Sequence, residues 1–561
     1  MGSASVLAAL LAASGCGGGS AQAEPPQLSA ATPATFSGAC ADLPARLGGL
    51  ANTTITASTS VPAGSLTVAG QAVPEHCLVT GRMFDRVSAV DGQAYAIGFE
   101  MRLPTQWNGR FFYQANGGSD GVVVAATGSS GGGPATHALL QRFAVLSSDA
   151  GHRAVLNPAF GIDPQARLDY GYQAVGKLTP MAKSLIQTAY GKGPDRSYFG
   201  GCSNGGRHAM VAASRYADQY DGILAGAPGY KLPTAAIANL AGGQLYASVA
   251  TDPVNLETGF TAVERRLVAS SVLAKCDALD GATDGLVQDV AACQSAFSLE
   301  RDVPTCSGAR DGTCLSAAQK TVIAKIFSGP TSSSGALIYA SFPYDAGISG
   351  SGIAFWEFSV PAQLNAGSVG MIFKVPPESP TGFNGQAFFQ SANIDTLVAQ
   401  VNATTSLYTE SGMSFMAPPN PTKLETLKNR GAKMLVYHGV SDPIFSVTDT
   451  QSWYQGLQAA NGGDASNFAR FLRVPGMGHC SGGPATDQFD AITPLVHWVE
   501  QGQAPAQVIA TARGPGNAGG ANADVPATWA ADRTRPLCPY PKVARYAGSG
   551  SLEVASNFRC E

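Results

Sequence analysis

Three serines lie in the pattern G-x-S-x-G, in which a serine on a tight turn acts as a nucleophile: Ser119, Ser130 and Ser203. The pattern alone says little in a chain with 67 glycines among 561 residues, because chance matches are expected. A nucleophile elbow must lie between a strand and a helix. Only Ser203 has a predicted strand before it, at 197–200, and a predicted helix after it, at 206–217. We therefore predict that Ser203 is the nucleophile and that the other two lie in a loop suited to backbone N–H donation.

A nucleophilic serine needs a base, and the chain has seven histidines. In doubly wound hydrolases the chain order is serine, acid, histidine, and the acid and the base follow late strands. His479 lies just beyond a predicted strand, whereas His438 precedes the best acid and His497 lies in a predicted helix. That acid is Asp442, in the turn after another predicted strand; a turn-capping aspartate is the less favoured alternative for this residue taken alone. The joint order and spacing favour a catalytic Ser-Asp-His triad.

Two cysteines flank the predicted nucleophile and base. Cys202 directly precedes Ser203, and Cys480 directly follows His479. A hydrogen bond between the serine and the histidine would bring these neighbours within reach of a disulfide. We expect such a bridge to fix the geometry of the pair.

The elements that must position these residues predict an α/β fold. Predicted strands and helices alternate up to about residue 228, and the alternation returns at the strands 433–437 and 469–474. Alternation of this kind indicates a parallel sheet with helices on both faces. Between roughly 246 and 430 it fails, so we expect one large insertion there.

Composition excludes several classes of protein. With 45% hydrophobic and 13% charged residues, the chain can bury a core and is not expected to be disordered. A net charge of −4 without a basic block excludes binding driven by nucleic-acid phosphates. No uninterrupted apolar run of about 18 residues is present, which excludes a bundle of membrane-spanning helices.

The cysteines and the N-terminus indicate export. None of the eleven cysteines forms a C-x-x-C pair, which argues against a zinc knuckle. Residues 6–16 are a short apolar stretch ending in small residues, which predicts a signal peptide over 1–16, and Cys16 also suits lipid anchoring. The other ten cysteines are compatible with five disulfides in an oxidising compartment. We expect a secreted or periplasmic monomer, or alternatively an outer-membrane lipoprotein, with a disordered leader over 17–39.

The Cys-Ser, Asp and His-Cys arrangement resembles that of the tannase and feruloyl esterase family, which includes the bacterial mono(2-hydroxyethyl) terephthalate (MHET) hydrolases. The resemblance covers nearly everything after about residue 72. It is strongest in five stretches: 107–112, 161–169, 220–230, 474–484 and 535–541. It implies an α/β-hydrolase fold in two parts, 40–245 and 431–561, with a large lid inserted over 246–430.

The same resemblance implies how the cysteines pair. The implied disulfides are Cys40–Cys77, Cys202–Cys480, Cys276–Cys293, Cys306–Cys314 and Cys538–Cys560. It also bears on the oxyanion hole, the pair of backbone donors that stabilises the negatively charged intermediates. The N–H of Asn204, one residue after the nucleophile, is one expected donor, and the family match indicates Gly118 as the other.

An acidic loop predicts a metal site. Asp277, Asp280 and Asp284 place three carboxylates within eight residues that also contain glycines. Oxygen ligands at this density suit Ca²⁺, although the spacing is not that of an EF-hand, and a solvated acidic loop is the alternative. The resemblance favours a structural calcium ion held by these side chains and by the backbone oxygens of Ala282 and Leu286. We expect no metal or organic cofactor in the chemistry itself.

The substrate is an aromatic ester by this resemblance. Trp356, Phe373, Lys374 and Phe383 are the expected contacts in the insertion, although its aromatic residues could equally form its core. A free carboxylate such as that of MHET is best bound by a bidentate arginine, and the insertion has no arginine between residues 310 and 430. This favours a secreted esterase acting on feruloyl-type or galloyl-type esters through an acyl-enzyme.

Two alternatives remain open. One is an MHET hydrolase, which releases terephthalate and ethylene glycol. The other is a catalytically inactive α/β-hydrolase that serves as a binding module, and it predicts a broken triad.

Overall fold

The computed structural model describes residues 25–130 and 137–561. The signal peptide expected over 1–16 and the lipid anchor expected at Cys16 lie outside these residues. Within the described part, no helix combines the length and the apolar character needed to cross a membrane.

A nine-stranded sheet forms the centre of the molecule, in the order β13-β12-β11-β10-β8-β9-β6-β5-β2. Neighbouring strands from β13 to β9 pair in parallel, as predicted, and β6, β5 and β2 continue the sheet in antiparallel fashion. The strands are β2 (Thr53–Val61), β5 (His76–Val87), β6 (Ala94–Pro104), β8 (Arg110–Gln114), β9 (Ala144–Ser148), β10 (Arg196–Cys202), β11 (Gly222–Gly226), β12 (Lys433–Gly439) and β13 (Ala469–Val474).

Both faces of the parallel part are covered. Successive side chains of a strand point to opposite faces: on β12, Met434 and Val436 belong to one hydrophobic core, whereas Leu435 and Tyr437 belong to the other. The first core includes residues of α3 and α4, and the second includes residues of α16. The helices outside the insertion are α1 (Leu43–Arg46), α2 (Pro164–Leu168), α3 (Ala174–Tyr190), α4 (Asn204–Arg215), α15 (Val447–Ala460) and α16 (Ile492–Gln501). Burial on both faces explains why β11, with the sequence GILAG, is a continuous apolar run.

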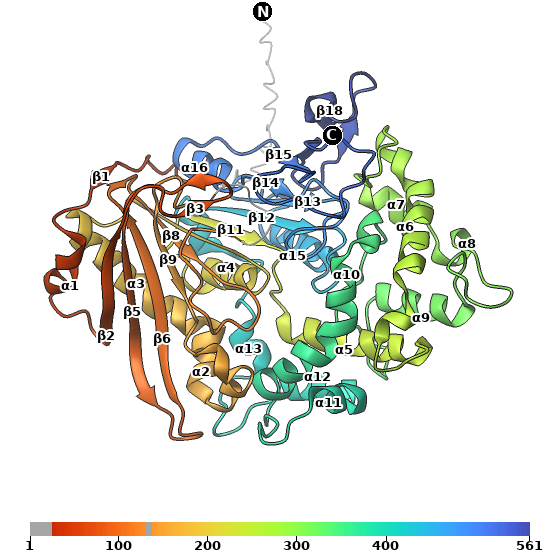
Figure 1. Ribbon diagram of the computed structural model, residues 1–561, viewed down its shortest axis with the longest axis horizontal. Coiled ribbons are helices and arrows are strands. Elements are labelled where there is room, and N and C mark those ends of the chain that lie inside the picture. The colour runs from red at the N-terminus through yellow and green to blue at the C-terminus, as the bar shows by residue number, and fades with distance from the viewer. Residues whose placement is uncertain (1–24, 131–136) are drawn as a thin grey trace, which may run out of the picture.

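The insertion between β11 and β12 is helical. Its elements are α5 (Leu232–Val249), α6 (Ala262–Cys276), α7 (Val290–Ala296), α8 (Leu299–Asp302), α9 (Ala317–Phe327), α10 (Gly352–Ala354), α11 (Gly385–Ser391), α12 (Ile394–Val401), α13 (Gly412–Met416) and α14 (Glu425–Asn429). Figure 1 shows most of these yellow-green and green helices to the right of the sheet and below it. The first of them begins before the expected boundary at 246, so the helical part of the insertion is longer than predicted.

Small sheets flank the core. β14 (Gln488–Phe489), β15 (Val508–Thr511) and β16 (Thr534–Leu537) form one, β17 (Ala544–Tyr546) pairs with β18 (Phe558–Cys560), and β3 (Thr67–Val68) pairs with β4 (Gln71–Ala72). Five disulfides are present, and they confirm the pairings that the resemblance implies: Cys40–Cys77, Cys202–Cys480, Cys276–Cys293, Cys306–Cys314 and Cys538–Cys560.

The described part of the leader differs from the disordered segment expected over 17–39. β1 (Ala34–Thr35) pairs with β7 (Gln106–Trp107) in antiparallel fashion. Further upstream, the side chain of Gln27 donates to the carbonyl of Val499, and the N–H of Ala31 donates to the Glu500 carboxylate. Backbone pairing and these contacts hold the segment from residue 25 onward against the hydrolase core.

Glu500, near the end of α16, joins three segments. Its carboxylate accepts two hydrogen bonds from the Arg110 guanidinium, at 2.6 and 2.7 Å, and one from the Tyr198 hydroxyl at 2.7 Å. The Glu500 side chain is only 1% exposed. Burial alone would raise its pKa, but the hydrogen bonds from Arg110 and its other partners hold the pKa of Glu500 below its usual value.

Removing this carboxylate is expected to destabilise the fold. Glu500→Ala leaves a largely buried guanidinium unpaired, which costs about 3–5 kcal/mol. Asp85→Ala is the control, because its pair with Arg82 is about half exposed and such pairs contribute only about 0–1 kcal/mol. Urea unfolding monitored by tryptophan fluorescence measures both variants. Equal losses in the two would contradict the assignment of Glu500 as a buried tie.

Candidate active site

Ser203 lies on a sharp turn between β10 and α4. Its φ of 66° is a conformation that non-glycine residues rarely adopt, and such strain concentrates at functional sites. The turn brings the backbone so close to Ala115 that a Cβ added at Gly201 or at Gly205 would lie 2.5 Å from its carbonyl oxygen. Both glycines of the G-x-S-x-G pattern are therefore required by the close approach of the backbone.

The other two serines of this pattern have no such setting. Ser119 and Ser130 both lie in the loop that follows β8, outside any strand or helix. Ser119 lines a cavity beside Ser203, whereas the buried hydroxyl of Ser130 has no hydrogen-bond partner among the residues that the structure describes. The structure thus places only Ser203 on a strand–turn–helix elbow.

The predicted acid and base meet Ser203 in a chain of hydrogen bonds. The Nε2 atom of His479 lies 2.8 Å from Oγ of Ser203, and its Nδ1 atom lies 2.7 Å from Oδ2 of Asp442. Asp442 follows β12, which pairs with β11, and His479 follows β13, the edge strand that pairs with β12. The three side chains have the arrangement and the distances of a serine hydrolase triad.

Asp442 is held as an anion by its surroundings. Its other oxygen, Oδ1, accepts hydrogen bonds from the N–H groups of Ile444 and Phe445, each at 3.0 Å. Burial alone would raise its pKa, but the positive potential of His479 and the hydrogen bonds from His438 and His479 hold the pKa of Asp442 well below its usual value. A carboxylate in this state can orient the imidazole and stabilise the imidazolium.

A disulfide connects the nucleophile elbow to the histidine loop. Cys202 and Cys480 have Cα atoms 6.1 Å apart and lie 278 residues apart in the sequence. A cross-link over so long a loop restricts the unfolded chain strongly. In the folded state it fixes the two neighbours that must stay within hydrogen-bond distance.

Asp345, in the insertion, joins the acid loop to the base loop. Its Oδ1 atom accepts hydrogen bonds from the hydroxyl of Ser441 at 2.5 Å and from the N–H of Gly476 at 3.0 Å. Ser441 is adjacent to Asp442, and Gly476 lies three residues before His479. A third donor is the N–H of Gly347 at 2.9 Å. The insertion thus takes part in holding the triad.

The two expected oxyanion donors lie beside Ser203. Gly118 and Asn204 both line the inner cavity at the serine. Asn204 is the first residue of α4, so its N–H has no partner within the helix. Gly118 has a φ of 63°, and its carbonyl accepts a hydrogen bond from the Tyr170 hydroxyl at 3.3 Å. The Tyr170 hydroxyl thus contacts the carbonyl of Gly118, not the N–H group that is the expected oxyanion donor.

Two cavities meet at Ser203. The outer one is lined by Gln114, Ala115, Asn116, Gly117, Gly118, Val124, Ser129, Cys202, Ser203, Trp356, His479 and Cys480. The inner one is lined by Gly118, Ser119, Tyr170, Ser203, Asn204, Leu232, Ala236, Trp356, Leu364, Asn365, Ser368, Phe373, Ile444 and Phe445. No charged side chain is among the described residues that line the inner cavity.

The insertion supplies one wall of the inner cavity. Its residues from Phe355 to Phe373 include three π-helical turns, a rare winding that is frequent at functional sites. Trp356 lies in the first turn, and its ring contacts the His479 ring edge to face at a centroid distance of 4.5 Å. Phe373 ends the last turn. Two of the four expected substrate contacts, Trp356 and Phe373, therefore line the cavity.

The other two expected contacts lie elsewhere. Neither Lys374 nor Phe383 is among the residues that line the two cavities at Ser203. The Lys374 ammonium is 2.8 Å from the Glu378 carboxylate and 2.9 Å from the carbonyl of Pro376, so its charge is used within its own loop. Phe383 packs against Phe388 with ring centroids 5.6 Å apart. The structure does not bring either side chain to the cavity.

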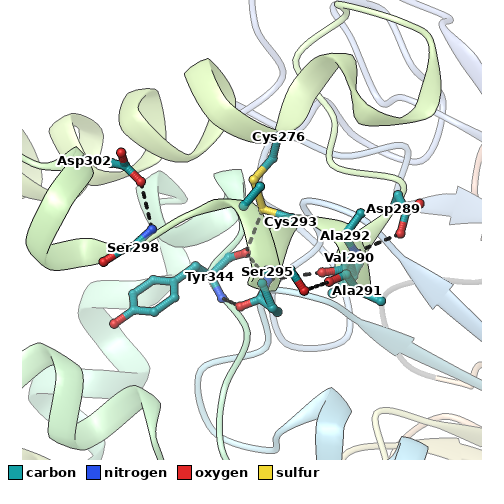
Figure 2. The surroundings of a disulfide bond; sticks show 12 residues. Cys276, Asp289, Val290, Ala291, Ala292, Cys293, Ser295, Ser298, Asp302 and Tyr344 are labelled. Atoms are coloured by element: carbon teal, nitrogen blue, oxygen red, sulfur yellow. Dashed lines mark hydrogen bonds between the residues drawn. A yellow bond between two sulfur atoms is a disulfide. The ribbon is translucent and has the colours of Figure 1, made fainter.

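The acidic loop lies between α6 and α7, and the disulfide Cys276–Cys293 joins the last residue of α6 to the middle of α7 (Figure 2). Asp277 accepts hydrogen bonds from the N–H groups of Asp284 and Gly285. Oδ2 of Asp284 pairs with the Arg535 guanidinium. The loop is therefore folded around its own carboxylates, unlike the solvated acidic loop that is the alternative from sequence.

One oxygen of this loop has no partner. Oδ2 of Asp280 is buried without a hydrogen bond, whereas Oδ1 accepts one from the N–H of Ala282. Burial, with the nearby charges of Asp284 and Asp277, raises the pKa of Asp280 to about 7. In the described residues no group of three or more histidine, cysteine or acidic side chains is already arranged as metal ligands. The donor chemistry fits a hard cation, which would have to draw the carboxylates together.

A parallel sheet with an elbow serine after one strand, and the acid and base after later strands, defines an α/β-hydrolase. A family model described as tannase and feruloyl esterase matches residues 77–561. Mono(2-hydroxyethyl) terephthalate hydrolase of Piscinibacter sakaiensis is 40% identical over 538 residues, which cover 89% of this chain and 87% of that protein. A probable feruloyl esterase B-1 of Neosartorya fischeri is 26% identical, covering 82% of each chain.

Solved structures agree on the fold. Feruloyl esterase B from Aspergillus oryzae matches with a TM-score of 0.73 at 22% identity, covering 93% of this chain and 99% of that one. Tannin acyl hydrolase from Aspergillus niger matches with a TM-score of 0.65 at 19% identity, covering 95% and 96%. The chain therefore belongs to the tannase and feruloyl esterase family, and it is a carboxylic ester hydrolase.

Sequence reasoning missed several polar residues of the site. Asp345 and Asp120 have no local pattern that marks them, because their partners come from distant segments. The sequence suggests for His438 only the role of a base, yet its Nε2 atom lies 3.2 Å from Oδ2 of Asp442, the oxygen that also contacts His479. Asn365 and Ser368 also line the inner cavity. Most of their neighbours in the sequence are apolar, so no polar motif marks these two residues.

Removing the Asp345 carboxylate should impair both stability and turnover. In Asp345→Ala the donors from Ser441, Gly476 and Gly347 lose their acceptor, and each buried unsatisfied donor costs about 1–3 kcal/mol. Small shifts of the acid and base loops should lower kcat by about tenfold or more. Asp345→Asn keeps an acceptor oxygen and should lose less of both. A wild-type kcat in folded Asp345→Ala would show that the hydrogen bonds of Asp345 to the acid and base loops are dispensable for turnover.

Proposed function

We propose that Ser203, His479 and Asp442 hydrolyse carboxylic esters through an acyl-enzyme. His479 Nε2 accepts the proton of the Ser203 hydroxyl as Oγ attacks the ester carbonyl, and Asp442 stabilises the resulting imidazolium. The imidazolium then donates this proton to the departing alcohol. Water activated by His479 attacks the acyl-serine, which releases the acid and regenerates the serine. The 2.7 and 2.8 Å contacts of His479 are the observation on which this mechanism depends.

The N–H groups of Gly118 and Asn204 are proposed to stabilise the oxyanion of each tetrahedral intermediate. Both residues line the cavity at Ser203, and Asn204 begins a helix, whose N-terminus favours negative charge. Loss of one such donor typically costs about 10²–10³ in rate.

The proposed substrates are esters of neutral or hydroxylated aromatic acids, such as feruloyl or galloyl esters. The inner cavity offers aromatic surfaces from Trp356, Phe373 and Phe445, with no charged side chain among its lining residues. The amide of Asn365 and the hydroxyl of Ser368 are suited to hydrogen-bond a ring hydroxyl group. Relatives named as probable feruloyl esterases support this substrate class.

The second candidate is hydrolysis of MHET. It is favoured by the relative from Piscinibacter sakaiensis, which is named for that reaction and is 40% identical to this chain. In this case the free carboxylate of MHET would have to be bound by neutral polar groups, because Lys374 is engaged by Glu378. Such binding is weaker than a charge-assisted pair.

Rates on methyl ferulate, methyl gallate and MHET distinguish these candidates. A missing charge-assisted hydrogen bond forgoes about 1.5–3 kcal/mol, so kcat/KM for MHET is expected to be about tenfold or more below that of the better methyl ester. A clear preference for MHET would reverse this ranking. In Ser203→Ala both turnover and labelling by a fluorophosphonate should be abolished. Folded wild-type protein that resists labelling would contradict the acyl-enzyme mechanism itself.

Five disulfides fit an oxidising compartment, in agreement with the expected export. We propose that the mature enzyme acts as a monomer. A lipid anchor at Cys16 remains a proposal that the sequence alone supports.

The acidic loop is proposed to bind a structural calcium ion. The ligands would be the side chains of Asp277, Asp280 and Asp284 with the backbone oxygens of Ala282 and Leu286. The buried, unpartnered oxygen of Asp280 and the density of carboxylates support this proposal. The ion would stabilise the lid loop and take no part in the ester chemistry.

Removing calcium should therefore lower the melting temperature. EDTA is expected to destabilise the wild type, and added CaCl₂ should restore it, because a ligand that binds only the folded state stabilises it. Asp280→Asn should make the melting temperature insensitive to both additions. An unchanged melting temperature in wild type from which all calcium has been removed would reject the calcium site.

A further inference from the structure

A carboxyl group outside the triad is buried directly behind the proposed oxyanion hole. Asp120 lies two residues after Gly118, in the loop that follows β8, and its side chain is 2% exposed. The acyl-enzyme steps proposed above make no use of it. Burying a carboxyl group costs free energy unless it is well paired. The contacts that Asp120 makes at this position therefore bear on its role.

Both side-chain contacts of Asp120 are made to the first two turns of α4. Oδ2 accepts a hydrogen bond from Nδ2 of Asn204 at 2.8 Å and lies 3.0 Å from Nε2 of His208. Asn204 is the residue whose N–H is the second proposed oxyanion donor. The carboxyl group therefore connects the loop of the first donor, Gly118, with the residue of the second.

The partner on the helix is itself fixed. Oδ1 of Asn204 accepts a hydrogen bond from Nε of Arg207 at 2.7 Å. The same guanidinium donates to the carbonyls of Gly171 at 2.8 Å and Met416 at 3.1 Å, and the Arg207 side chain is completely buried. The amide of Asn204 thus has one orientation, with its NH₂ group toward Asp120.

The loop is fixed from its other side as well. The carbonyl of Asp120 accepts a hydrogen bond from Nδ2 of Asn157 at 3.0 Å, and its N–H donates to the carbonyl of Gly117 at 3.3 Å. Asp120 has a φ of 54°, and the next residue, Gly121, has a φ of 92°. Asp120 needs such contacts to keep this conformation, since a non-glycine residue with a φ in this region costs about 1–3 kcal/mol, whereas Gly121 adopts its φ freely.

We propose that Asp120 is a positioning residue that sets the separation of the two oxyanion donors. The inference rests on the proposed function of Gly118 and Asn204. Oxyanion donors act only when they lie about 2.7–3.1 Å from the developing charge. One carboxyl group that holds the Gly118 loop against the start of α4 fixes both donors relative to Ser203.

The test compares Asp120→Ala with Asp120→Asn. Asp120→Ala should lower kcat on methyl ferulate about 10- to 100-fold with little change in KM, because the donors act mainly in the transition state. Asp120→Asn keeps an oxygen that can accept from Asn204 and should restore most of the rate. Asp163→Ala is the matched control: Asp163 is a buried carboxylate paired with Arg86, and its loss should lower stability with kcat unchanged.

A second measurement separates positioning from general stability. Boron of phenylboronic acid accepts a bond from Oγ of Ser203 while the hydroxyl proton passes to Nε2 of His479, and the resulting tetrahedral boronate anion places one of its hydroxyl oxygens in the oxyanion hole. Its affinity should fall in Asp120→Ala by about the same factor as kcat/KM. Binding of a neutral aromatic amide that forms no adduct should stay unchanged. The double variant Asp120→Ala/Asn204→Ala should lose little more kcat than the worse of the two single variants, because both substitutions remove the same hydrogen bond between Asp120 and Asn204.

The outcomes distinguish this inference from the proposed function. Wild-type kcat and boronate affinity in folded Asp120→Ala would overturn the positioning role while leaving the triad mechanism intact. Activity that survives in Ser203→Ala would overturn the proposed function itself. Should Asp120→Ala fail to fold, Asn204→Ala keeps the backbone donor and removes the side chain that contacts both Asp120 and Arg207. The same losses of kcat and boronate affinity are expected there, and their absence would overturn the role of Asp120.

Discussion

The hydrogen bond between His479 and Ser203 connects segments 276 residues apart, and most of the site is arranged to keep it at 2.8 Å. The elbow brings Ser203 to the edge of the sheet in a backbone conformation that glycines at 201 and 205 make accessible. The disulfide Cys202–Cys480 fixes the neighbour of each partner. Hydrogen-bond geometry tolerates only a few tenths of an ångström, so one such contact requires support from the sheet, the loops and the insertion together.

The parts of the site that could be predicted from the sequence are those with a local signature. Ser203 could be selected because the glycines, the preceding strand and the following helix lie within a few residues of it. Asp442 and His479 follow strands that their apolar runs mark clearly, and the order of the three is constrained by the topology of parallel sheets. The disulfide pairings required the family resemblance, since sequence spacing does not determine which cysteines meet.

The remaining parts depend on contacts between distant segments. Asp345 meets Ser441 and Gly476 only because the insertion folds back between two strand ends. The sequence predicts Lys374 as a substrate contact because it is the only cation between Lys325 and Lys423. Instead, the Lys374 ammonium forms an ion pair with the carboxylate of Glu378, four residues further along the chain. Composition and spacing do not show which of several possible partners a charged side chain will contact. The leader shows the same effect, because its pairing with β7 depends on an exposed strand edge.

The insertion both lines the inner cavity and supports the loops that carry the acid and the base. Its π-helical turns supply Trp356 and Phe373 to the wall of the inner cavity, and Asp345, ten residues before this segment, holds the loops of the acid and the base. Lids are often regarded as interchangeable modules, which tune selectivity while the core performs the chemistry. Here a lid transplanted from a relative would also replace part of the scaffold of the triad. Evolution or engineering of new selectivity in this enzyme is therefore constrained to changes within the lid wall that leave the Asp345 segment in place.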